Sequence, residues 1–352
     1  MAKKKKTSKA KKIIIAFSGV VILSVIGIGY NFYVKFYSSN IHYKEGEKNY
    51  LYVHTGSTFN DIVSDLQKKD IVIDTVSFIK VAQYLHFLDN IHPGKYLLKP
   101  GMNNVQLVRL LKSGKQVPVE LVMKKFRTKK DLIHYVSFQL EADSLSLDSV
   151  FSDAGFLQQY NFTADNSIAV IIPNTYEFYW NTNAKKFFQK MAEEHKKFWN
   201  EERLREANDL GLTPVKVQTV ASIVEEESNR NDEKPIIASV YLNRLNKKMN
   251  LEADPTVKYA IGDFSIKRIS LEMTRYDSPY NTYVSPGLPP GPICTPSAIT
   301  IDAVLKPAQT DYLFFCARPD GSGYHTFATT FAEQKKNAKL YHVELNKRGI
   351  HS

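Results

Sequence analysis

The sequence has little cysteine, with only Cys294 and Cys316 among its 352 residues. Two cysteines provide neither a disulfide framework nor the spacing of a zinc site. The sequence also lacks a glycine-rich phosphate loop and the Gly-x-Ser-x-Gly turn of serine hydrolases, so neither class of enzyme is indicated. We expect two ordinary thiols in a core, although an exported location would allow the two cysteines to pair.

Positive charge is concentrated at the amino terminus. The net charge is +11, and seven lysines precede the first apolar run: Lys3, Lys4, Lys5, Lys6, Lys9, Lys11 and Lys12. The run extends from Ile13 to Tyr30, and no charged residue follows before Lys35. A helix needs about 20 apolar residues to cross a bilayer, so the run predicts a transmembrane helix. Basic residues before it predict a cytoplasmic amino terminus and an exported remainder.

The apolar run is interpreted as a retained anchor rather than a cleaved signal peptide. No small-x-small cleavage site follows it, and five aromatic residues near its end are typical of a membrane interface: Tyr30, Phe32, Tyr33, Phe36 and Tyr37. We predict a basic cytoplasmic tail at 1–12, a transmembrane helix at 13–34 and a polar tether at 35–49. Because the lysines are explained as a topology signal, binding to nucleic acid is not expected.

Residues 50–120 predict a small folded unit. A strand at 50–53 is followed by two amphipathic helices, an extended segment at 93–101 and a helix that ends at Gly114. The order of strand, two helices and strand resembles a LysM module, a fold that binds glycans containing N-acetylglucosamine. Small mixed domains of this pattern are common, so glycan binding and a purely structural role both remain open.

Residues 121–352 predict a second, mixed domain. Helices are expected near 128–140 and 145–160, a long surface helix over 184–210, a helix over 235–245, a hairpin of strands at 312–317 and 323–327, and a closing helix over 331–346. The fold class is therefore α+β, with an amino-terminal transmembrane helix, a small LysM-like module and a mixed α+β catalytic domain. Turn-rich segments between 251 and 308 are typical of the lining of a site.

Three adjacent carboxylates lie at the end of a predicted helix after Pro214. Its apolar face carries Val217, Val220, Ala221 and Val224. At 100° per residue, Glu226 points away from this face, whereas Glu225 and Glu227 lie at its two borders. A carboxyl against an apolar face can stay protonated near neutral pH, as an acid that cleaves a glycosidic bond must. Three adjacent glutamates on a helix more commonly form a solvent-exposed acidic edge. The helix geometry alone does not decide whether Glu225 or Glu227 is the acid.

Several motifs in order resemble the endolytic murein transglycosylase family of MltG or YceG-like proteins. They are Ala221–Ser228, Leu242–Leu245, Ala253–Val257, Tyr280–Tyr283, Gly287–Ile293 and His325–Phe327. In that family the motif reads Ser-Ile-Val-Glu-Lys-Glu, and the resemblance implies that its second glutamate, the catalytic acid, is Glu227. Glu226 replaces the usual lysine, and a neighbouring anion tends to raise the pKa of Glu227. Glu225 is the runner-up.

The resemblance implies cleavage of the bond from N-acetylmuramic acid to N-acetylglucosamine within peptidoglycan strands, without water. Glu227 would protonate the leaving oxygen and then accept the proton of the muramyl 6-hydroxyl, which closes a 1,6-anhydro ring. No metal or organic cofactor is required. The remaining expected site residues are contacts to substrate or supports of the acid: Glu225, Asp254, Thr256, Asn281, Thr282 and Tyr283, with Tyr176, Glu177, His325 and Thr326 as second-rank candidates.

Two alternatives remain open. A hydrolytic muramidase would need a water molecule and a second carboxylate such as Asp254, although Asp-Pro-Thr equally suits a turn. A membrane-tethered scaffold would bind glycan without cutting it. In every case the expected partners are peptidoglycan strands and the membrane, with peptidoglycan synthases as natural neighbours. The expected location is the cytoplasmic membrane in a single pass, with the catalytic domain on the outer side.

Overall fold

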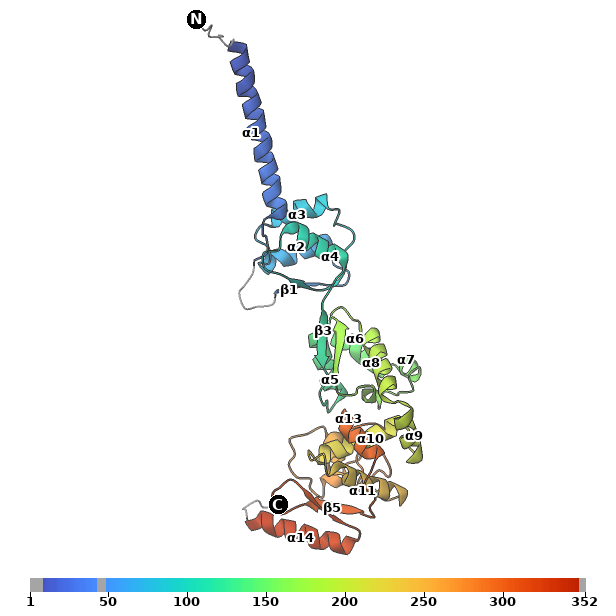
Figure 1. Ribbon diagram of the computed structural model, residues 1–352. Coiled ribbons are helices and arrows are strands. Elements are labelled where there is room, and N and C mark those ends of the chain that lie inside the picture. The colour runs from blue at the N-terminus through green and yellow to red at the C-terminus, as the bar shows by residue number, and fades with distance from the viewer. Residues whose placement is uncertain (1–8, 43–48, 348–352) are drawn as a thin grey trace. The chain divides into compact units, whose positions relative to one another are not determined.

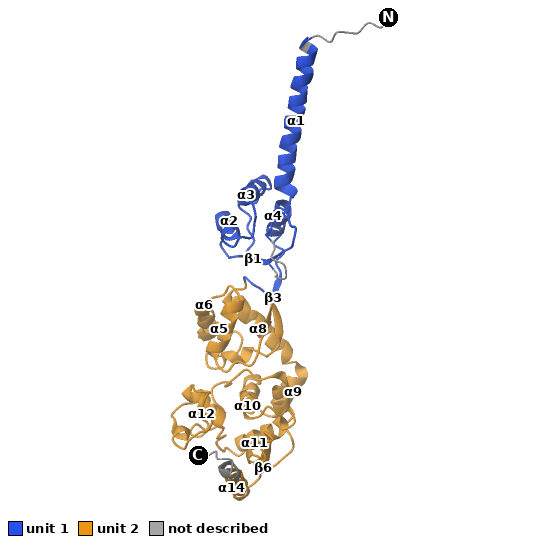
Figure 2. Ribbon diagram, turned by 90° about the vertical axis from the view of Figure 1, so that its left-hand side faces the viewer, with its two compact units in different colours: residues 1–119, 179–181 blue, residues 120–178, 182–352 orange. Residues whose placement is uncertain are grey.

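The computed structural model describes residues 9–42 and 49–347, and these form a mixed α+β fold (Figure 1). The chain divides into two compact units (Figure 2). Unit 1 comprises residues 1–119 and 179–181, and unit 2 comprises 120–178 and 182–352. The predicted α+β class is confirmed. Most of the basic tail expected at 1–12, and residues 43–48 of the expected tether, lie outside the described residues.

Helix α1 spans Lys9–Tyr37 and carries the apolar run. Within the described residues it is the helix long and apolar enough to cross a membrane, and its apolar window is not buried by the rest of the chain. The helix continues three residues past the predicted end at position 34. Its last turn enters the core of unit 1, because Phe36 is only 7% exposed and packs among that unit's buried residues.

Unit 1 has the predicted order of strand, two helices and strand. Strand β1 (Asn49–Val53) pairs antiparallel with β2 (Gly94–Leu98), so that Leu51 lies opposite Tyr96. Helices α2 (Phe59–Lys68) and α3 (Thr75–Tyr84) lie between the strands in sequence, and α4 (Asn104–Ser113) follows. Their starts are fixed by side-chain caps, among them the Thr58–Asp61 capping box of α2.

The tether expected at 35–49 differs from the observed structure. Ser39 and Ile41 form isolated β-bridges, to Asn103 and Val72 respectively, and Ile41 is buried. Asn40 is buried as well, and its side-chain amide donates to Asn104 Oδ1 at 2.7 Å. The polar composition suggested a solvated segment, but its polar groups are satisfied by hydrogen bonds inside unit 1.

The first part of unit 2 is mostly helical. Strands β3 (Pro118–Val122) and β4 (Thr175–Tyr179) pair with each other. The helices of this part are α5 (Lys129–Gln139), α6 (Ser144–Ser152), α7 (Ala154–Gln158), the 3₁₀ turn η1 (Ser167–Val170), α8 (Ala184–Phe198) and α9 (Glu201–Asp209).

Two helix predictions in this part are corrected. The helix expected at 145–160 is interrupted because Asp153 caps α7, and the long helix expected at 184–210 is interrupted because Asn200 caps α9. Helix α8 is also less exposed than expected, since it buries Phe187, Phe188 and Met191.

The glutamate helix α10 (Pro214–Glu227) is the centre of the second part of unit 2. Every residue from Val217 to Val224 is buried, and the helix contacts α11 (Lys234–Asn246), α12 (Asp254–Ile261) and α13 (Ala298–Leu305). The predicted hairpin is β5 (Phe314–Ala317) paired antiparallel with β6 (His325–Ala328). Helix α14 (Phe331–Lys347) packs on β5, and the short turn η2 covers Met273–Arg275.

The Gly287–Ile293 motif is a loop that is hydrogen-bonded to α10 at Ser222. The backbone N–H of Ile293 donates to Ser222 Oγ at 3.0 Å, and Ser222 is fully buried on α10. At Gly291 the loop passes so close to another segment that a Cβ would lie 2.4 Å from the carbonyl oxygen of Asp165. Only glycine allows this approach.

Both cysteines are free thiols, as expected. Cys294 is buried after this loop, and burial raises the pKa of its thiol well above the usual value. Cys316 lies half-buried on β5.

Candidate active site

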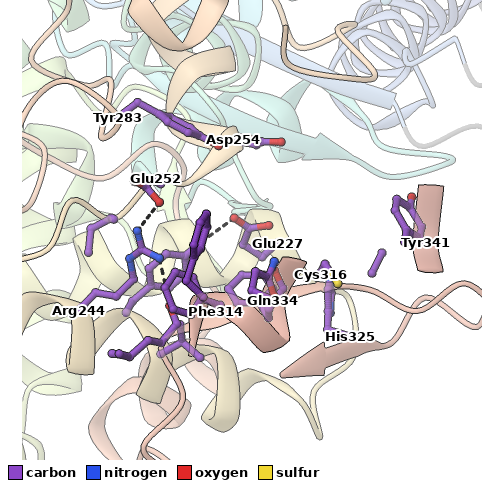
Figure 3. Close-up of a pocket in the computed structure, with 17 residues that line it drawn as sticks. Glu227, Arg244, Glu252, Asp254, Tyr283, Phe314, Cys316, His325, Gln334 and Tyr341 are labelled. Atoms are coloured by element: carbon purple, nitrogen blue, oxygen red, sulfur yellow. Dashed lines mark hydrogen bonds and ion pairs between the residues drawn. The ribbon is translucent and has the colours of Figure 1, made fainter. Parts of the chain in front are cut away.

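A pocket of about 490 Å³ opens where the end of α10 meets α11, the start of α12, the β5–β6 hairpin and α14 (Figure 3). Its polar lining includes Glu227, Arg244, Glu252, Asp254 and His325. Its apolar lining includes Leu251, Leu313–Phe315 and Phe331. Polar groups that converge on a partly apolar cavity are typical of a small-molecule or glycan site.

Glu227 is the last residue of α10 and points into the pocket (Figure 3). Burial raises the pKa of its carboxyl to about 7, against a weaker lowering effect of the hydrogen bond from Tyr241. The negative charges of Asp254 and Glu226 add to the rise, and Lys258 opposes it. Glu227 is therefore a carboxylic acid that keeps its proton for a substantial fraction of the time at neutral pH.

Tyr241 holds this acid in place from α11. Its hydroxyl donates to Glu227 Oε1 at 2.6 Å, and its side chain is 2% exposed. Burial raises the pKa of the Tyr241 phenol well above its usual value, so it remains a neutral donor. Because Oε1 accepts this hydrogen bond, the proton of the neutral acid belongs on Oε2.

Glu226 points to a different environment. Its two carboxylate oxygens form ion pairs with Lys125, at 2.9 Å, and with Arg127, at 3.1 Å. Its side chain is thus taken up by two cations, and Glu226 is not part of the described lining of the pocket. This agrees with the helix geometry, by which Glu226 is the poorest candidate for the acid.

Glu225 is the partner of a buried lysine. Its carboxylate lies 3.0 Å from Lys234 Nζ and 3.0 Å from the hydroxyl of Ser297, and it also accepts from Thr300. Burial alone would raise the pKa of Glu225, but the hydrogen bonds of Thr300 and Lys234 bring it below its usual value. A carboxylate held in this way is a poor proton donor, so of the three glutamates Glu227 alone combines a raised pKa with access to the pocket.

Asp254 and Tyr283 also line the pocket. The Tyr283 hydroxyl donates to Asp254 Oδ1 at 2.7 Å, and Asp254 is the exposed first residue of α12. Burial and the charge of Asp254 raise the pKa of Tyr283, so the phenol stays neutral. The pair places an anion near the acid, as the effect of Asp254 on the pKa of Glu227 indicates.

Thr256, Asn281 and Thr282 were expected to contact substrate, but they are buried and do not line the pocket. The hydroxyl of Thr282 accepts from the backbone N–H of Ala253 at 3.0 Å and lies 2.9 Å from that of Thr256. The Asn281 amide donates to two carbonyl oxygens of the adjoining loop, those of Thr274 and Tyr276. These residues fix the backbone near Asp254 and Tyr283, because their polar groups form hydrogen bonds within the loops.

Tyr176, Glu177 and Thr326 are also absent from the described lining of the pocket. Tyr176 lies on β4, where its buried hydroxyl donates to the carbonyl oxygen of Ile172 at 2.7 Å. Glu177 is exposed on the same strand, and Thr326 lies opposite Cys316 in the hairpin. Tyr176 and Phe178 are both buried, so these two aromatic side chains of β4 belong to a core.

His325 lines the pocket and has a buried acidic partner. Its Nδ1 lies 2.9 Å from Glu233 Oε2, and its backbone N–H donates to Glu233 Oε1 at 2.8 Å. The Glu233 side chain is 5% exposed. A carboxylate at Nδ1 favours the tautomer with the proton on Nδ1, which leaves Nε2 as the nitrogen available for other contacts.

Several residues of the pocket were not predicted from the sequence. Tyr241 and Arg244 were not among the expected site residues. Arg244 donates to two backbone carbonyl oxygens, of Asn250 and Leu313, and pairs with Glu252. A signal was present for both. Tyr241 and Arg244 lie on a helix that faces the core, and a phenol or guanidinium there needs a polar partner.

The fold and the site together define a class: an α+β protein with an amino-terminal apolar helix, whose pocket presents one carboxylic acid with a pKa raised to about 7. The model of the YceG-like family matches residues 51–340, and the chain belongs to this family. The family predicted from the motifs is thereby confirmed.

Individual relatives agree with this membership. The chain is 28% identical over 313 residues to a Bacillus subtilis protein named endolytic murein transglycosylase. The aligned residues cover 84% of this chain and 85% of the relative. A Streptococcus pneumoniae protein of the same name is 28% identical over 295 residues, which cover 74% of this chain and 53% of that protein. A crystal structure of a YceG-like protein from Listeria monocytogenes covers 82% of this chain and 98% of its own, with a TM-score of 0.55 and 30% identity.

Proposed function

We propose that this protein is an endolytic lytic transglycosylase of peptidoglycan and that Glu227 is its catalytic acid. The observation that carries the proposal is the carboxyl of Glu227, with its pKa raised to about 7, in a pocket of a chain whose relatives are named endolytic murein transglycosylases. Three polar groups of the pocket come from separate elements: the acid from α10, its phenol partner from α11 and the carboxylate of Asp254 from α12.

The reaction uses one carboxyl twice. Glu227 gives the proton on Oε2 to the oxygen that leaves from C1 of N-acetylmuramic acid, and the glycosidic bond breaks. The resulting carboxylate then takes the proton of the muramyl 6-hydroxyl, whose oxygen bonds to C1 and closes the 1,6-anhydro ring. The acid is regenerated and no water is consumed. The phenol of Tyr241 keeps Oε1 fixed through both steps.

We propose supporting roles for the other polar residues of the pocket. Asp254, oriented by Tyr283, is an anion on the side of the pocket where positive charge develops at C1. His325, oriented by Glu233, contacts the substrate through Nε2. Glu225 supports the end of α10 through Lys234 and has no direct contact with substrate.

For the rest of the chain we propose a LysM-like glycan-binding domain at 50–120 and a catalytic domain at 121–352. The antiparallel β1–β2 pair with α2 and α3 between its strands supports the first assignment. Helix α1 is proposed as a single membrane span with the amino terminus in the cytoplasm, because lysines precede it. Both domains then lie on the outer side, next to peptidoglycan synthases that release new strands.

The test is mass spectrometry of uncrosslinked peptidoglycan strands after incubation with the purified full chain in detergent. Products that end in anhydro-muramic acid, lighter by one water than reducing ends, are expected. Reducing ends would instead indicate a hydrolase in which Asp254 activates a water. Intact strands that still bind the protein would indicate a non-enzymatic scaffold.

A further inference from the structure

An apolar surface of unit 1 lies next to the end of α1. Three of its side chains are unusually exposed for their type: Ile73 is 67% exposed, Val76 61% and Tyr84 64%. Val76, Lys80 and Tyr84 recur at every fourth position of α3 and so share one face of that helix. Exposed apolar side chains that gather in one place indicate a contact surface.

Tyr84 connects this surface to α1. Its ring packs edge-on against Phe32 and Phe36, with centroids 6.0 Å and 5.2 Å away. Both views of the molecule show α3 at the end of unit 1 from which α1 extends (Figures 1 and 2). The surface therefore begins at the last two turns of α1.

The depth of those turns in a bilayer follows from the charges on α1. Residues 13–34 carry no charge, and Lys35 is the next charged residue. At 1.5 Å per residue the uncharged segment spans about 33 Å, close to the hydrocarbon thickness of about 30 Å. Lys35 thus marks the outer boundary, and Phe32 and Tyr84 lie within about one helical turn of it, at the level where aromatic rings are favoured.

Unit 1 is fixed to this boundary by folded structure. Phe36 is part of the core of unit 1, and the buried amide of Asn104 donates to the carbonyl oxygen of Lys35 at 2.8 Å. The Asn103 amide donates to the carbonyl oxygen of Tyr37 at 3.4 Å. A helix that packs into a core in this way cannot turn freely as a flexible tether would. The exposed face of α3 is consequently held at the level of the lipid head groups.

We propose that Ile73, Val76, Lys80 and Tyr84, here called the α3 face, dock on the phospholipid surface of the bilayer that α1 crosses. The inference rests on the proposed role of α1 as a membrane span, and it adds a second contact with lipid. Ile73 and Val76 enter the boundary between head groups and acyl chains, and Lys80 extends its ammonium group to the phosphates. The α3 face continues the lipid-exposed surface of α1 through Phe32 and Tyr84.

The test places a reporter on the α3 face of the full chain in phospholipid vesicles. Val76→Trp replaces an exposed side chain, and the vesicles contain lipids brominated near the head-group end of the acyl chains, which quench tryptophan on contact. The unsubstituted chain, with Trp180 and Trp199, supplies the background emission. Tyr84→Trp is a second reporter in case the first variant folds poorly. The expected result is loss of most of the added emission, and its recovery when Ile73→Asp is combined with Val76→Trp.

Unquenched emission from both reporters, in protein that floats with the vesicles and cuts glycan, would overturn docking of the α3 face and leave the proposed enzyme intact. Protein that does not float with the vesicles would overturn the membrane span and the docking together. Cleavage of strands in detergent, measured on the same preparation, reports on Glu227 independently of both results.

Discussion

At the end of α10 the side chains of Glu225, Glu226 and Glu227 meet different partners. Two of the carboxylates face cations, on Lys234 in one case and on Lys125 and Arg127 in the other. The third faces a phenol and an apolar wall. The hydrogen bonds of Thr300 and Lys234 stabilise the charged form of Glu225, whereas burial stabilises the neutral form of Glu227. These two residues of one type therefore differ in their ability to donate a proton.

We expect Glu227→Gln to lower strand cleavage by at least about 100-fold, the usual contribution of a general acid. The amide keeps the shape of the side chain and the hydrogen bond from Tyr241 but has no acidic proton to transfer to the leaving oxygen. Glu226→Gln is the matched control. The Glu226 carboxylate is adjacent in sequence but lies outside the pocket, so this variant should retain most of the activity. Comparable losses in both variants would contradict the assignment. The measurement is the initial rate of release of strand fragments.

The pH dependence of kcat/KM should report the pKa of Glu227. With proton donation rate-limiting, kcat/KM is expected to fall as the pH rises through about 7. Tyr241→Phe removes a hydrogen bond that lowers this pKa, so the fall should move to higher pH. Asp254→Asn removes a negative charge that raises it, so the fall should move to lower pH. Shifts in the same direction for both variants would contradict the electrostatic account.

Thermal unfolding tests the same pKa without substrate. The folded pKa of Glu227, about 7, lies above its ordinary value of 4.5, so the folded state binds the proton more tightly than the unfolded state. The resulting stabilisation is present at low pH and is lost as the pH rises through about 7. Glu227→Gln does not titrate, so it does not lose this stabilisation as the pH rises. The melting temperature of the variant minus that of the unsubstituted protein should therefore increase from pH 5 to pH 8. A constant difference would contradict the raised pKa.

Some of the site was predictable from residues and some was not. The helix geometry correctly placed Glu226 away from the apolar face but left Glu225 and Glu227 equivalent, because the cation that separates them, Lys234, comes from another helix. Asn281 and Thr282 were expected to contact the substrate or to support the acid. In the structure their side chains bond to the backbone of the loop instead, which only the folded arrangement reveals.

At the scale of elements, the Gly287–Ile293 loop supports α10 from outside the pocket. Its end is bonded to Ser222, five residues before the acid, and its middle passes against the backbone at Asp165. Because the contact at Gly291 is with backbone, it cannot be relieved by a side-chain rotation. The position of the acid therefore depends on a residue without a side chain.

Gly291→Ala is expected to destabilise the protein by about 1–3 kcal/mol, the usual cost of overpacking, and to reduce activity by displacing the loop that contacts Ser222. The free energy of unfolding from urea titration is the measurement. Gly155→Ala is the control, since the nearest atom to its Cβ would be at an ordinary 3.5 Å. Equal free energies of unfolding for the two variants would show that the loop can move away from Asp165 without loss of stability.

Element boundaries were predicted well where apolar periodicity was strong and poorly where polar residues were involved. The strand order of unit 1 and the hairpin after Tyr312 follow the sequence pattern. The break between α8 and α9 was missed, because Asn200 acts as a cap in the middle of a charged segment that reads as continuous helix. Residues 38–42 look like linker in composition, yet they hydrogen-bond across unit 1.

At the scale of the whole molecule, the folded junction predicts how the chain can be shortened. A fragment that begins at residue 50 loses three buried side chains of unit 1, those of Phe36, Asn40 and Ile41. Burial of a Phe and an Ile contributes about 3 kcal/mol or more, so this fragment should be less stable than one that begins at residue 31. Hydrogen exchange of the paired strands β1 and β2 is the measurement. Equal protection in both fragments would contradict a stabilising role of residues 36–41. Phe36→Ala in the longer fragment should lower the protection of β1 and β2 by part of the difference between the two fragments.

The same junction determines how the protein meets its substrate. With α1 in a bilayer and its last turn packed into unit 1, that unit diffuses laterally and rotates about the membrane normal, but it does not range through the space above the surface. For the glycan-binding role proposed for unit 1, encounters with a strand are then events within a thin layer, and their frequency depends on surface densities rather than on bulk concentrations. A strand that has grown out of this layer is beyond the reach of unit 1, whatever its affinity.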